Sequence, residues 1–453
     1  MDQHIIYLLP IIFSLSGALI SLFADRAGSV AASVLSLASA LYLLFQPVCI
    51  DGYLYIDGFS KILILTIALV YISTVFYSLT YLKHIENLLF QHRLYYILLN
   101  IFVATMFFSV SMDNLGLIWV GVEATTVSSA LLIATENNNV TVESAWRYVI
   151  IVSTGLIISL IAVTFIYGSA GTLSLHALLQ HHPDNRVFLI GIMLGIVGFG
   201  TKAGIFPMHT WLPDVHGKAP APVSAIFSAV LLPVALYAIA RLMFIFPSKT
   251  VQLFAFVLGI LTVAVAALIM TVQTNYKRMF AYSSMENMGM ILIGLSLGGY
   301  GLLGAVIIIL SHGLAKSSVF FLTGDILSIS HTTNMQQVNG LIRRLPRAAS
   351  ALFLAAMAVT GAPPFAIFVG ELFIFAAMIA KFGWLLALVV ILLLAVAFIS
   401  VNFKTGKMIF TGKNDLKRER SRTETWVAIV NLVLSFLVIF FIPYFETLLK
   451  NLL

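Results

Sequence analysis

The sequence predicts an all-α polytopic membrane protein: a single bundle over residues 1–453, with about 14 transmembrane helices. Three observations predict this class. Hydrophobic residues make up 60% of the chain and charged residues only 9%, against about 25% charged in a soluble domain. The mean hydropathy is +1.04. Apolar stretches long enough to cross a bilayer recur along the whole chain, which excludes an ordinary soluble domain.

The apolar stretches give the spans in order. They are expected at 4–23, 28–47, 60–82, 92–111, 114–134, 144–168, 186–206, 220–245, 250–272, 279–298, 301–327, 349–379, 383–404 and 425–445. The first is expected to be a span rather than a secretory signal peptide, because its apolar run continues for about 20 residues and no basic segment precedes it. The single cysteine, Cys49, excludes a disulfide framework and a cysteine-ligated iron–sulfur cluster within this chain.

The loops alternate in charge. Loops after odd-numbered spans carry most of the basic residues: Arg26, Lys83, Arg93, Lys218, Lys277, Arg278, Arg343, Arg344, Arg347, Lys407, Lys413, Lys417, Arg418, Arg420 and Arg422. Loops after even-numbered spans hold few charges, among them Arg186, Lys249, Lys381 and Asp51. The positive-inside rule therefore predicts cytoplasmic basic loops and both termini outside. The basic run 413–422 lies between two spans, so lipid headgroups or a cytoplasmic partner suit it better than nucleic acid.

Two spans are interrupted at corresponding places. Span 7 breaks at 204–207 and span 12 at 361–365, each at glycine and proline. The breaks are five spans apart, and an odd offset turns one half upside down relative to the other. The sequence thus predicts an inverted repeat of spans 4–8 (about 92–245) and 9–13 (about 250–404), flanked by helices in 1–82 and 425–447. Interrupted helices at matching places indicate a transport site.

A lysine and a carboxylate lie within apolar spans. Lys202 precedes the break in span 7, and Glu123 lies in the middle of span 5. A charge at bilayer depth costs at least about 2.5–3.5 kcal/mol, so it is kept mainly where it faces a polar interior. We expect Glu123 to be the ion partner of Lys202, its distance controlling whether the lysine holds its proton. A static ion pair that fixes two helices is the alternative.

Three further ionisable residues extend this set. His312 and Lys316 are four residues apart on span 11 and therefore share a helix face, where they can pass on a proton. Glu371 follows the break in span 12 and can exchange the proton with one aqueous side. The alternatives are a histidine bonded to a carbonyl, a snorkelling lysine and a carboxylate that caps the broken helix.

Other polar residues allow two readings. Glu286 and Asp325, near the ends of spans 10 and 11, suit a proton entry path or simple solvation equally. His209, Asp214 and His216 lie in the link after span 7, where capping or solvation is favoured over proton access.

Two charges next to the spans have simpler interpretations. Arg241, near the outer end of span 8, is expected to snorkel, and Asp57 is expected to cap span 3. No phosphate-binding loop, dinucleotide fingerprint or metal-ligand spacing occurs, so no catalytic residue, cofactor or metal site is expected in this chain.

Several motifs resemble one family. The segment 198–224, with Lys202, 209–214 (HTWLPD) and 219–224 (APAPVS), closely resembles the antiporter-like membrane subunits of respiratory complex I and of Mrp cation/proton antiporters. His312 with Lys316, and Pro363 with Glu371, fit the same pattern. The pieces 119–126 and 283–289 are most similar to the version in group 4 membrane-bound hydrogenases, called hydrogenase-4 component F.

The resemblance implies a bacterial or archaeal inner-membrane subunit with fourteen helices and a polar axis at half-membrane depth. Along that axis Glu123 and Lys202 would form the Glu/Lys pair, His312 and Lys316 the middle, and Glu371 the terminal exchanger. The sequence departs from the family on span 8, where many relatives carry a His or Lys and this chain has nothing titratable around Ser228. Either water near Ser228 bridges Lys202 to His312, or proton transfer along the axis is impaired.

Four functions remain open on this basis. The first is a proton-translocating subunit of a redox complex, with other membrane subunits and cytoplasmic redox subunits as partners. The second is an Mrp-type antiporter module, which would move H⁺ or Na⁺. The third is a membrane partner of a cytoplasmic zinc enzyme for inorganic-carbon uptake, and the fourth is a scaffold that no longer conducts.

Overall fold

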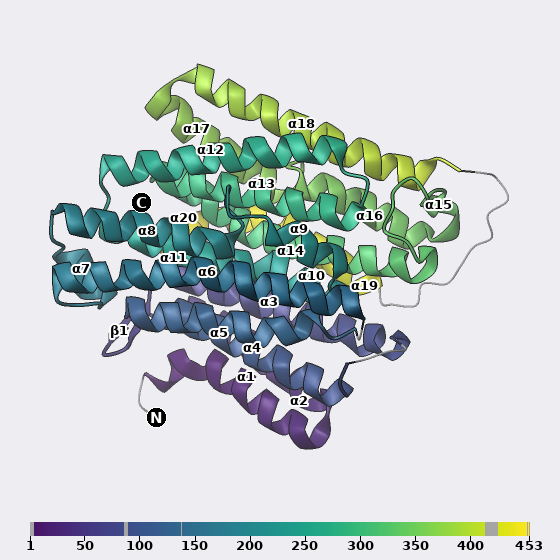
Figure 1. The fold of residues 1–453 in the computed structure, drawn as a ribbon, viewed down its shortest axis with the longest axis horizontal. Coiled ribbons are helices and arrows are strands. Elements are labelled where there is room, and N and C mark those ends of the chain that lie inside the picture. Colours follow the sequence, from purple (N-terminus) through teal and green to yellow (C-terminus); the bar gives the residue numbers. More distant parts are fainter. Residues whose placement is uncertain (1–3, 86–88, 137, 413–424, 451, 453) are drawn as a thin grey trace.

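The computed structural model describes residues 4–85, 89–136, 138–412, 425–450 and 452. Its helices run side by side from one end of the molecule to the other (Figure 1). One end, called the hairpin end here, holds the strands β1 (Cys49–Asp51) and β2 (Leu54–Ile56) and the short α7 (Leu175–Gln180). The opposite end, called the basic end, holds α15 (Leu341–Arg344), which includes Arg343 and Arg344.

The first half of the chain supplies the following further helices: α1 (Ile5–Ala24), α2 (Arg26–Leu44), α3 (Gly58–Tyr81), η1 (Leu82–His84), α4 (His92–Ser111), α5 (Leu115–Ile133), α6 (Asn139–Ala170), α8 (Arg186–Ala203), α9 (Trp211–Lys218), α10 (Ala221–Ile226), the π turn η2 (Phe227–Leu231) and α11 (Leu232–Ile245). The second half supplies α12 (Lys249–Val272), α13 (Tyr276–Leu297), α14 (Tyr300–Ser330), α16 (Pro346–Val359), α17 (Ala366–Phe382), α18 (Trp384–Phe410), α19 (Thr425–Leu437), η3 (Val438–Phe441) and α20 (Ile442–Leu449).

The number of spans agrees with the sequence. Within the described residues, 12 helical segments are long and apolar enough to cross a membrane. The helix α13 is less apolar because it carries Ser283, Ser284, Glu286 and Asn287, yet its 22 residues rise about 33 Å. The broken pair α16–α17 makes up the remaining crossing. The prediction of a multi-span helical membrane protein is confirmed.

Capping residues fix where the spans begin. Asp57, Asn114 and Asn275 each accept a hydrogen bond from a backbone N–H in the first turn of the following helix. Such caps satisfy donors that the helix itself leaves free. The predicted cap at Asp57 is confirmed. The two breaks begin at Gly204 (φ +73°) and Gly361 (φ +69°), a left-handed conformation that favours glycine.

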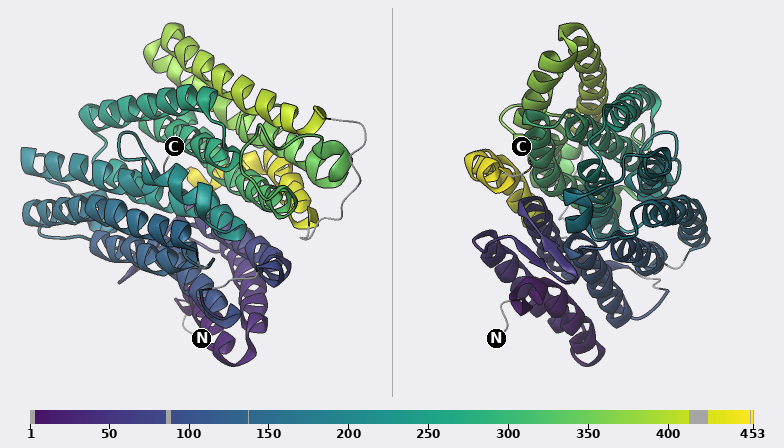
Figure 2. Two further views of the ribbon diagram at one scale, coloured as in Figure 1. Left: turned by 45° about the vertical axis from the view of Figure 1, so that its right-hand side comes forward. Right: turned by 90° about the vertical axis from the view of Figure 1, so that its left-hand side faces the viewer.

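The most buried helices form the centre of the bundle. All residues in the most apolar stretches of the segment α10–α11 and of the helix α14 are buried, whereas only 33% are buried in the corresponding stretches of α1 and α18. In both views of Figure 2, α1–α2 and α17–α18 lie at opposite edges of the molecule. Their exposed leucine, isoleucine and phenylalanine side chains suit contact with lipid. The middle of the bundle is therefore the place where buried polar groups need explanation.

Four small elements were not predicted from the sequence: the hairpin β1–β2 and the short helices α7, α9 and α15. Each is too short to give a hydrophobic period. The basic residues Lys413, Lys417, Arg418, Arg420 and Arg422 lie outside the described residues.

The prediction that Arg241 snorkels is wrong. Its side chain is 1% exposed, and its two terminal nitrogens donate to Asp57 at 2.7 Å each. The guanidinium also lies 4.6 Å from the ring centre of Tyr237 and donates to Ser60. Because a bidentate carboxylate satisfies the charge inside the protein, the arginine need not reach the membrane surface. The pair joins the start of α3 to the end of α11 at the hairpin end.

Candidate functional site

Lys202 lies at the end of α8, fully buried among helices α5, α6 and α9. Its ammonium donates to the Thr126 hydroxyl at 2.6 Å and to the Tyr148 hydroxyl at 2.8 Å. Tyr148 in turn shares a hydrogen bond of 2.8 Å with Ser129. Hydroxyl groups can accept from the ammonium and donate onward, which is what a proton carrier requires of its neighbours. Neither Thr126 nor Tyr148 was predicted from the sequence to belong to the site.

Glu123 does not form the direct ion pair with Lys202 that the sequence suggested. Its Oε1 accepts from Ser153 at 3.1 Å, and its buried Oε2 has no partner among the described residues. The two charges still interact electrostatically. Thr126 is three residues after Glu123 and therefore lies on the same face of α5. The carboxylate stands next to the lysine's hydroxyl partners rather than on the lysine.

The π turn η2 in span 8 allows this span to contribute a backbone polar group to the site, although it has no titratable residue there. In this turn the Leu232 N–H bonds to the carbonyl of Phe227, five residues earlier. In the same register Ser228 would bond to residue 233, which is a proline and has no N–H. The Ser228 carbonyl is thus left without a helical donor. Such π turns occur frequently at functional sites.

The His312 side chain forms a hydrogen bond with this carbonyl. Its Nε2 lies 3.3 Å from the Ser228 carbonyl oxygen. A carbonyl accepts only, so Nε2 carries the proton and Nδ1 is the basic nitrogen in the neutral ring. Nδ1 is buried and has no partner among the described residues. The ring is therefore held in the tautomer that leaves one nitrogen free to accept a proton.

Lys316 and Glu286 continue the set on α14 and α13. Lys316 is fully buried, donates to the Phe280 carbonyl at 2.9 Å and interacts electrostatically with Glu286. Glu286 is 2% exposed, so the solvated position allowed by the sequence is wrong. Asn287 donates to Glu286 at 3.2 Å and to the carbonyl of Val359, at the end of α16, at 3.1 Å. Glu286 thus lies between Lys316 and the break in span 12.

Glu371 lies against that break. A Cβ added to Gly361 would come 2.4 Å from its Oε2 and 2.6 Å from its Oε1. The side chain is in electrostatic range of Glu286 and is 8% exposed. The absence of a side chain at residue 361 is what makes room for this carboxylate.

The residues considered for proton access lie towards the basic end. Asp214 accepts from Arg278 at 2.6 Å, and this is a partly exposed surface pair. Asp325 is fully buried and accepts from Tyr77 and Thr425, so simple solvation is wrong for it. His209 is 8% exposed.

His216 is likewise not solvated. It is fully buried, its ring centre lies 4.8 Å from that of Phe320 on α14, and both ring nitrogens lack a partner among the described residues.

Several residues named by the sequence therefore form one buried arrangement, in which the ring of Tyr148, a partner of Lys202, lies 6.0 Å from the ring of Phe227 in the π turn. It runs from α5 and α8, past the π turn, through α14 and α13 to α17, and includes Glu123, Lys202, Ser228, His312, Lys316, Glu286 and Glu371. Its members come from segments more than 200 residues apart in the chain. The arrangement presents buried acids and bases in sequence.

Comparisons with known proteins agree with this architecture. Residues 111–397 match the family described as NADH:quinone oxidoreductase/Mrp antiporter, TM. A hydrogenase-4 component F homolog of Methylacidiphilum infernorum (isolate V4) is 31% identical over 372 residues, which is 77% of each chain.

Solved structures are similar over almost the whole chain. One chain of the membrane-bound sulfane sulfur reductase, an archaeal respiratory membrane complex, is 26% identical with a TM-score of 0.87, covering 99% of this chain and 96% of that chain. One chain of the Mrp complex from Dietzia sp. DQ12-45-1b has a TM-score of 0.89 at 20% identity, covering 100% of this chain and 98% of that chain. The protein thus belongs to the transmembrane NADH:quinone oxidoreductase/Mrp antiporter family.

Proposed function

We propose that this chain is the proton-translocating, antiporter-like membrane subunit of a multisubunit redox-driven complex. The observation that carries the proposal is the convergence of Lys202, His312, Lys316 and Glu286 in the interior of the bundle, each at most 2% exposed. Burying so many ionisable groups is costly, so such groups in membrane proteins mark ion paths. The component F homolog, by its name, is related to a hydrogenase component, which suits a redox-driven complex.

The geometry supports a relay with a switch at one end. If Glu123 moves towards Lys202, it stabilises the charged amine, and if it moves away, the proton is released. The released proton passes by Tyr148 and water near Ser228 to the free Nδ1 of His312. From there Lys316 and Glu286 carry it to Glu371. Electron transfer takes place in partner subunits, and its energy reaches this chain through the position of Glu123.

The predicted inverted repeats remain part of the proposal. Asn114 caps α5 and bridges to Ser174 at the hairpin end, while Asn275 caps α13 and bridges to Asn334. The second bridge lies at the basic end, as an inverted repeat requires. The helices that follow, α6 and α14, are both unusually long, with 32 and 31 residues. These pairs support equivalence of 92–245 and 250–404.

The same proposal covers location and partners. The protein lies in a bacterial or archaeal inner membrane with its basic end in the cytoplasm and both termini outside, following the positive-inside rule. Its neighbours are other membrane subunits, and cytoplasmic redox subunits dock to the complex. The transported ion is H⁺, and measuring uptake in the presence and absence of Na⁺ distinguishes the two cations.

Replacing Glu286 with glutamine tests the relay at the residue whose position the sequence left open. The amide keeps the shape and the hydrogen bond from Asn287 but cannot take up a proton. We expect proton uptake by the assembled complex in vesicles to fall at least about tenfold, because a positioned proton carrier contributes roughly 10²–10⁴-fold to proton transfer. Uptake is measured together with the redox activity of the partner subunits.

The matched control is Glu143→Gln. Glu143 is an exposed carboxylate on α6 that pairs with Arg147, so the control removes the same charge outside the arrangement. It is expected to leave uptake unchanged. If both variants pump like the wild type while fully assembled, the relay through Glu286 is rejected.

A further inference from the structure

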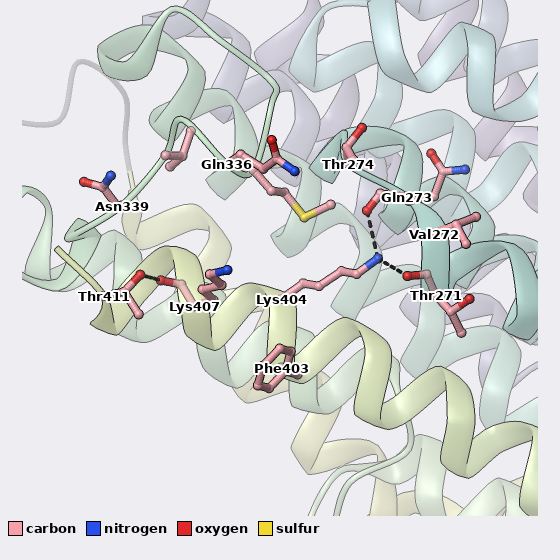
Figure 3. Close-up of a pocket in the computed structure, with 12 residues that line it drawn as sticks. Thr271, Val272, Gln273, Thr274, Gln336, Asn339, Phe403, Lys404, Lys407 and Thr411 are labelled. Atoms are coloured by element: carbon pink, nitrogen blue, oxygen red, sulfur yellow. Dashed lines mark hydrogen bonds between the residues drawn. The ribbon is translucent and has the colours of Figure 1, made fainter.

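A pocket of about 530 Å³ opens at the basic end, away from the buried relay (Figure 3). It lies between the C-terminal ends of α12 and α18 and the loop that joins α14 to α15. Its polar lining includes the amides of Gln273, Gln336 and Asn339 and the side chains of Lys404 and Lys407. None of these residues belongs to the proton pathway proposed above.

Lys404 neutralises one wall of the pocket. Its ammonium donates to the carbonyls of Met270, Thr271 and Gln273 at 2.7–2.8 Å. The last carbonyls of a helix have no helical donor and carry its partial negative charge. Three of these groups at the end of α12 are thus satisfied by one cation. An anion in the pocket would therefore not face an uncompensated helix end.

Lys407 supplies a cation that the fold does not use in this way. It lies one turn after Lys404 on α18 and is exposed. Gln336 and Asn339 are exposed on the facing loop, and Figure 3 shows both beside the pocket opposite α18. An ammonium and amide N–H donors around one space suit a phosphate group.

The pocket also has an apolar edge. Val272 is 73% exposed and Phe403 is 71% exposed, and both line the pocket. Val272 is the last residue of α12, and Phe403 lies about two turns before the end of α18. A ligand with a charged head and an apolar tail matches both parts, whereas a free phosphate ion would leave the apolar edge exposed.

We propose that this pocket binds the headgroup of an anionic phospholipid. Lys407 contacts the phosphate, and the amides of Gln273, Gln336 and Asn339 bond to the headgroup. An acyl chain runs along Val272 and Phe403 into the bilayer. Bound in this way, the lipid holds together the ends of α12 and α18 and the loop between α14 and α15.

The test is a lipid titration of the purified full chain in detergent, followed by native mass spectrometry. Phosphatidylglycerol is expected to bind more tightly than phosphatidylcholine. Lys407→Gln is expected to weaken phosphatidylglycerol binding about fivefold, since one lysine near an anionic surface contributes about 1 kcal/mol. Gln336→Ala, on the facing loop, is also expected to weaken it. Millimolar inorganic phosphate is expected not to displace the lipid.

Lys249→Gln is the matched control, because Lys249 is an exposed lysine at the opposite end of α12. It should bind phosphatidylglycerol like the wild type. Equal lipid affinity in the Lys407 and Lys249 variants would overturn the proposal, as would equal binding of the two lipids. Displacement by inorganic phosphate would show a simple anion site instead and would also overturn it. Thermal unfolding of each variant in detergent establishes that it is folded.

Discussion

Replacing Lys202 with alanine is expected to lower proton uptake by the assembled complex to below about a tenth of the wild-type rate. Lys202 is the only amine in the first half of the proposed relay, so its removal takes away the basic proton carrier that Glu123 is proposed to control. The fold is expected to persist, because the hydroxyls of Thr126 and Tyr148, which now accept from the ammonium, can bond to other partners. Uptake and partner turnover are measured in the same vesicles.

A suitable control is Lys381→Ala. Lys381 lies near the end of α17 and donates to Gln252 and to the Ser296 carbonyl, outside the arrangement. We expect this variant to pump normally. Normal pumping by the Lys202 variant, with intact assembly, would mean that the lysine has a structural role. Loss of assembly in the Lys202 variant, but not in the Lys381 variant, would mean that the buried lysine holds helices together and does not carry protons.

Gly361→Ala is expected to lower uptake by about ten- to a hundredfold without disrupting assembly, since misplacing a reacting group by about 1 Å can cost roughly 10²-fold. The new methyl group would lie 2.4 Å from Glu371 Oε2, so the carboxylate must move. The glutamate side chain is flexible enough to do so at little cost in stability. The variant therefore displaces a proposed proton carrier without altering its chemistry.

Gly171→Ala separates this displacement from backbone strain. Gly171, which follows α6, is left-handed with φ +71° and ψ 1°, and nothing lies within 4 Å of an added Cβ. Both variants carry the strain of a left-handed alanine, about 1–2 kcal/mol, and both should lose similar thermal stability in detergent. Only the Gly361 variant should lose uptake. Equal uptake in the two variants would show that the position of Glu371 is unimportant.

The hydropathy of the sequence was sufficient to predict where the spans lie, because most of them face lipid or other apolar helices. Spans such as 92–111 were predicted to the residue, matching α4. Hydropathy alone describes α13 less well, because this helix carries polar residues that are buried against neighbouring helices. The free-energy cost of placing a charge in the membrane interior correctly predicted that Lys202, His312 and Lys316 face the inside of the bundle, where they are fully buried.

Partners were harder to predict than burial. Arg241 lies in an apolar stretch like Lys202, and the same reasoning about charge would have predicted a partner for it. Its partner Asp57 is 184 residues away, a pairing that no local pattern reveals. The Thr126 and Tyr148 hydroxyls were missed for the same reason, although the spacing of Thr126 from Glu123 was a usable signal.

The region around Ser228 shows a different limit. The sequence showed the missing titratable residue, and Pro233 was visible, but the π turn that frees the Ser228 carbonyl depends on tertiary packing. The departure from the family therefore looked like a gap in the path. In the fold it provides a carbonyl that fixes the tautomer of His312.

In the proposed relay, protons cross from Lys202 to His312 through a hydrated passage beside Ser228. A high-resolution cryo-electron microscopy map of the assembled complex in a lipid environment tests this most directly. We expect ordered water between the Tyr148 hydroxyl and the Nδ1 atom of His312. A map in which Phe227 and its neighbours fill that space, with no ordered water between the two groups, would contradict it.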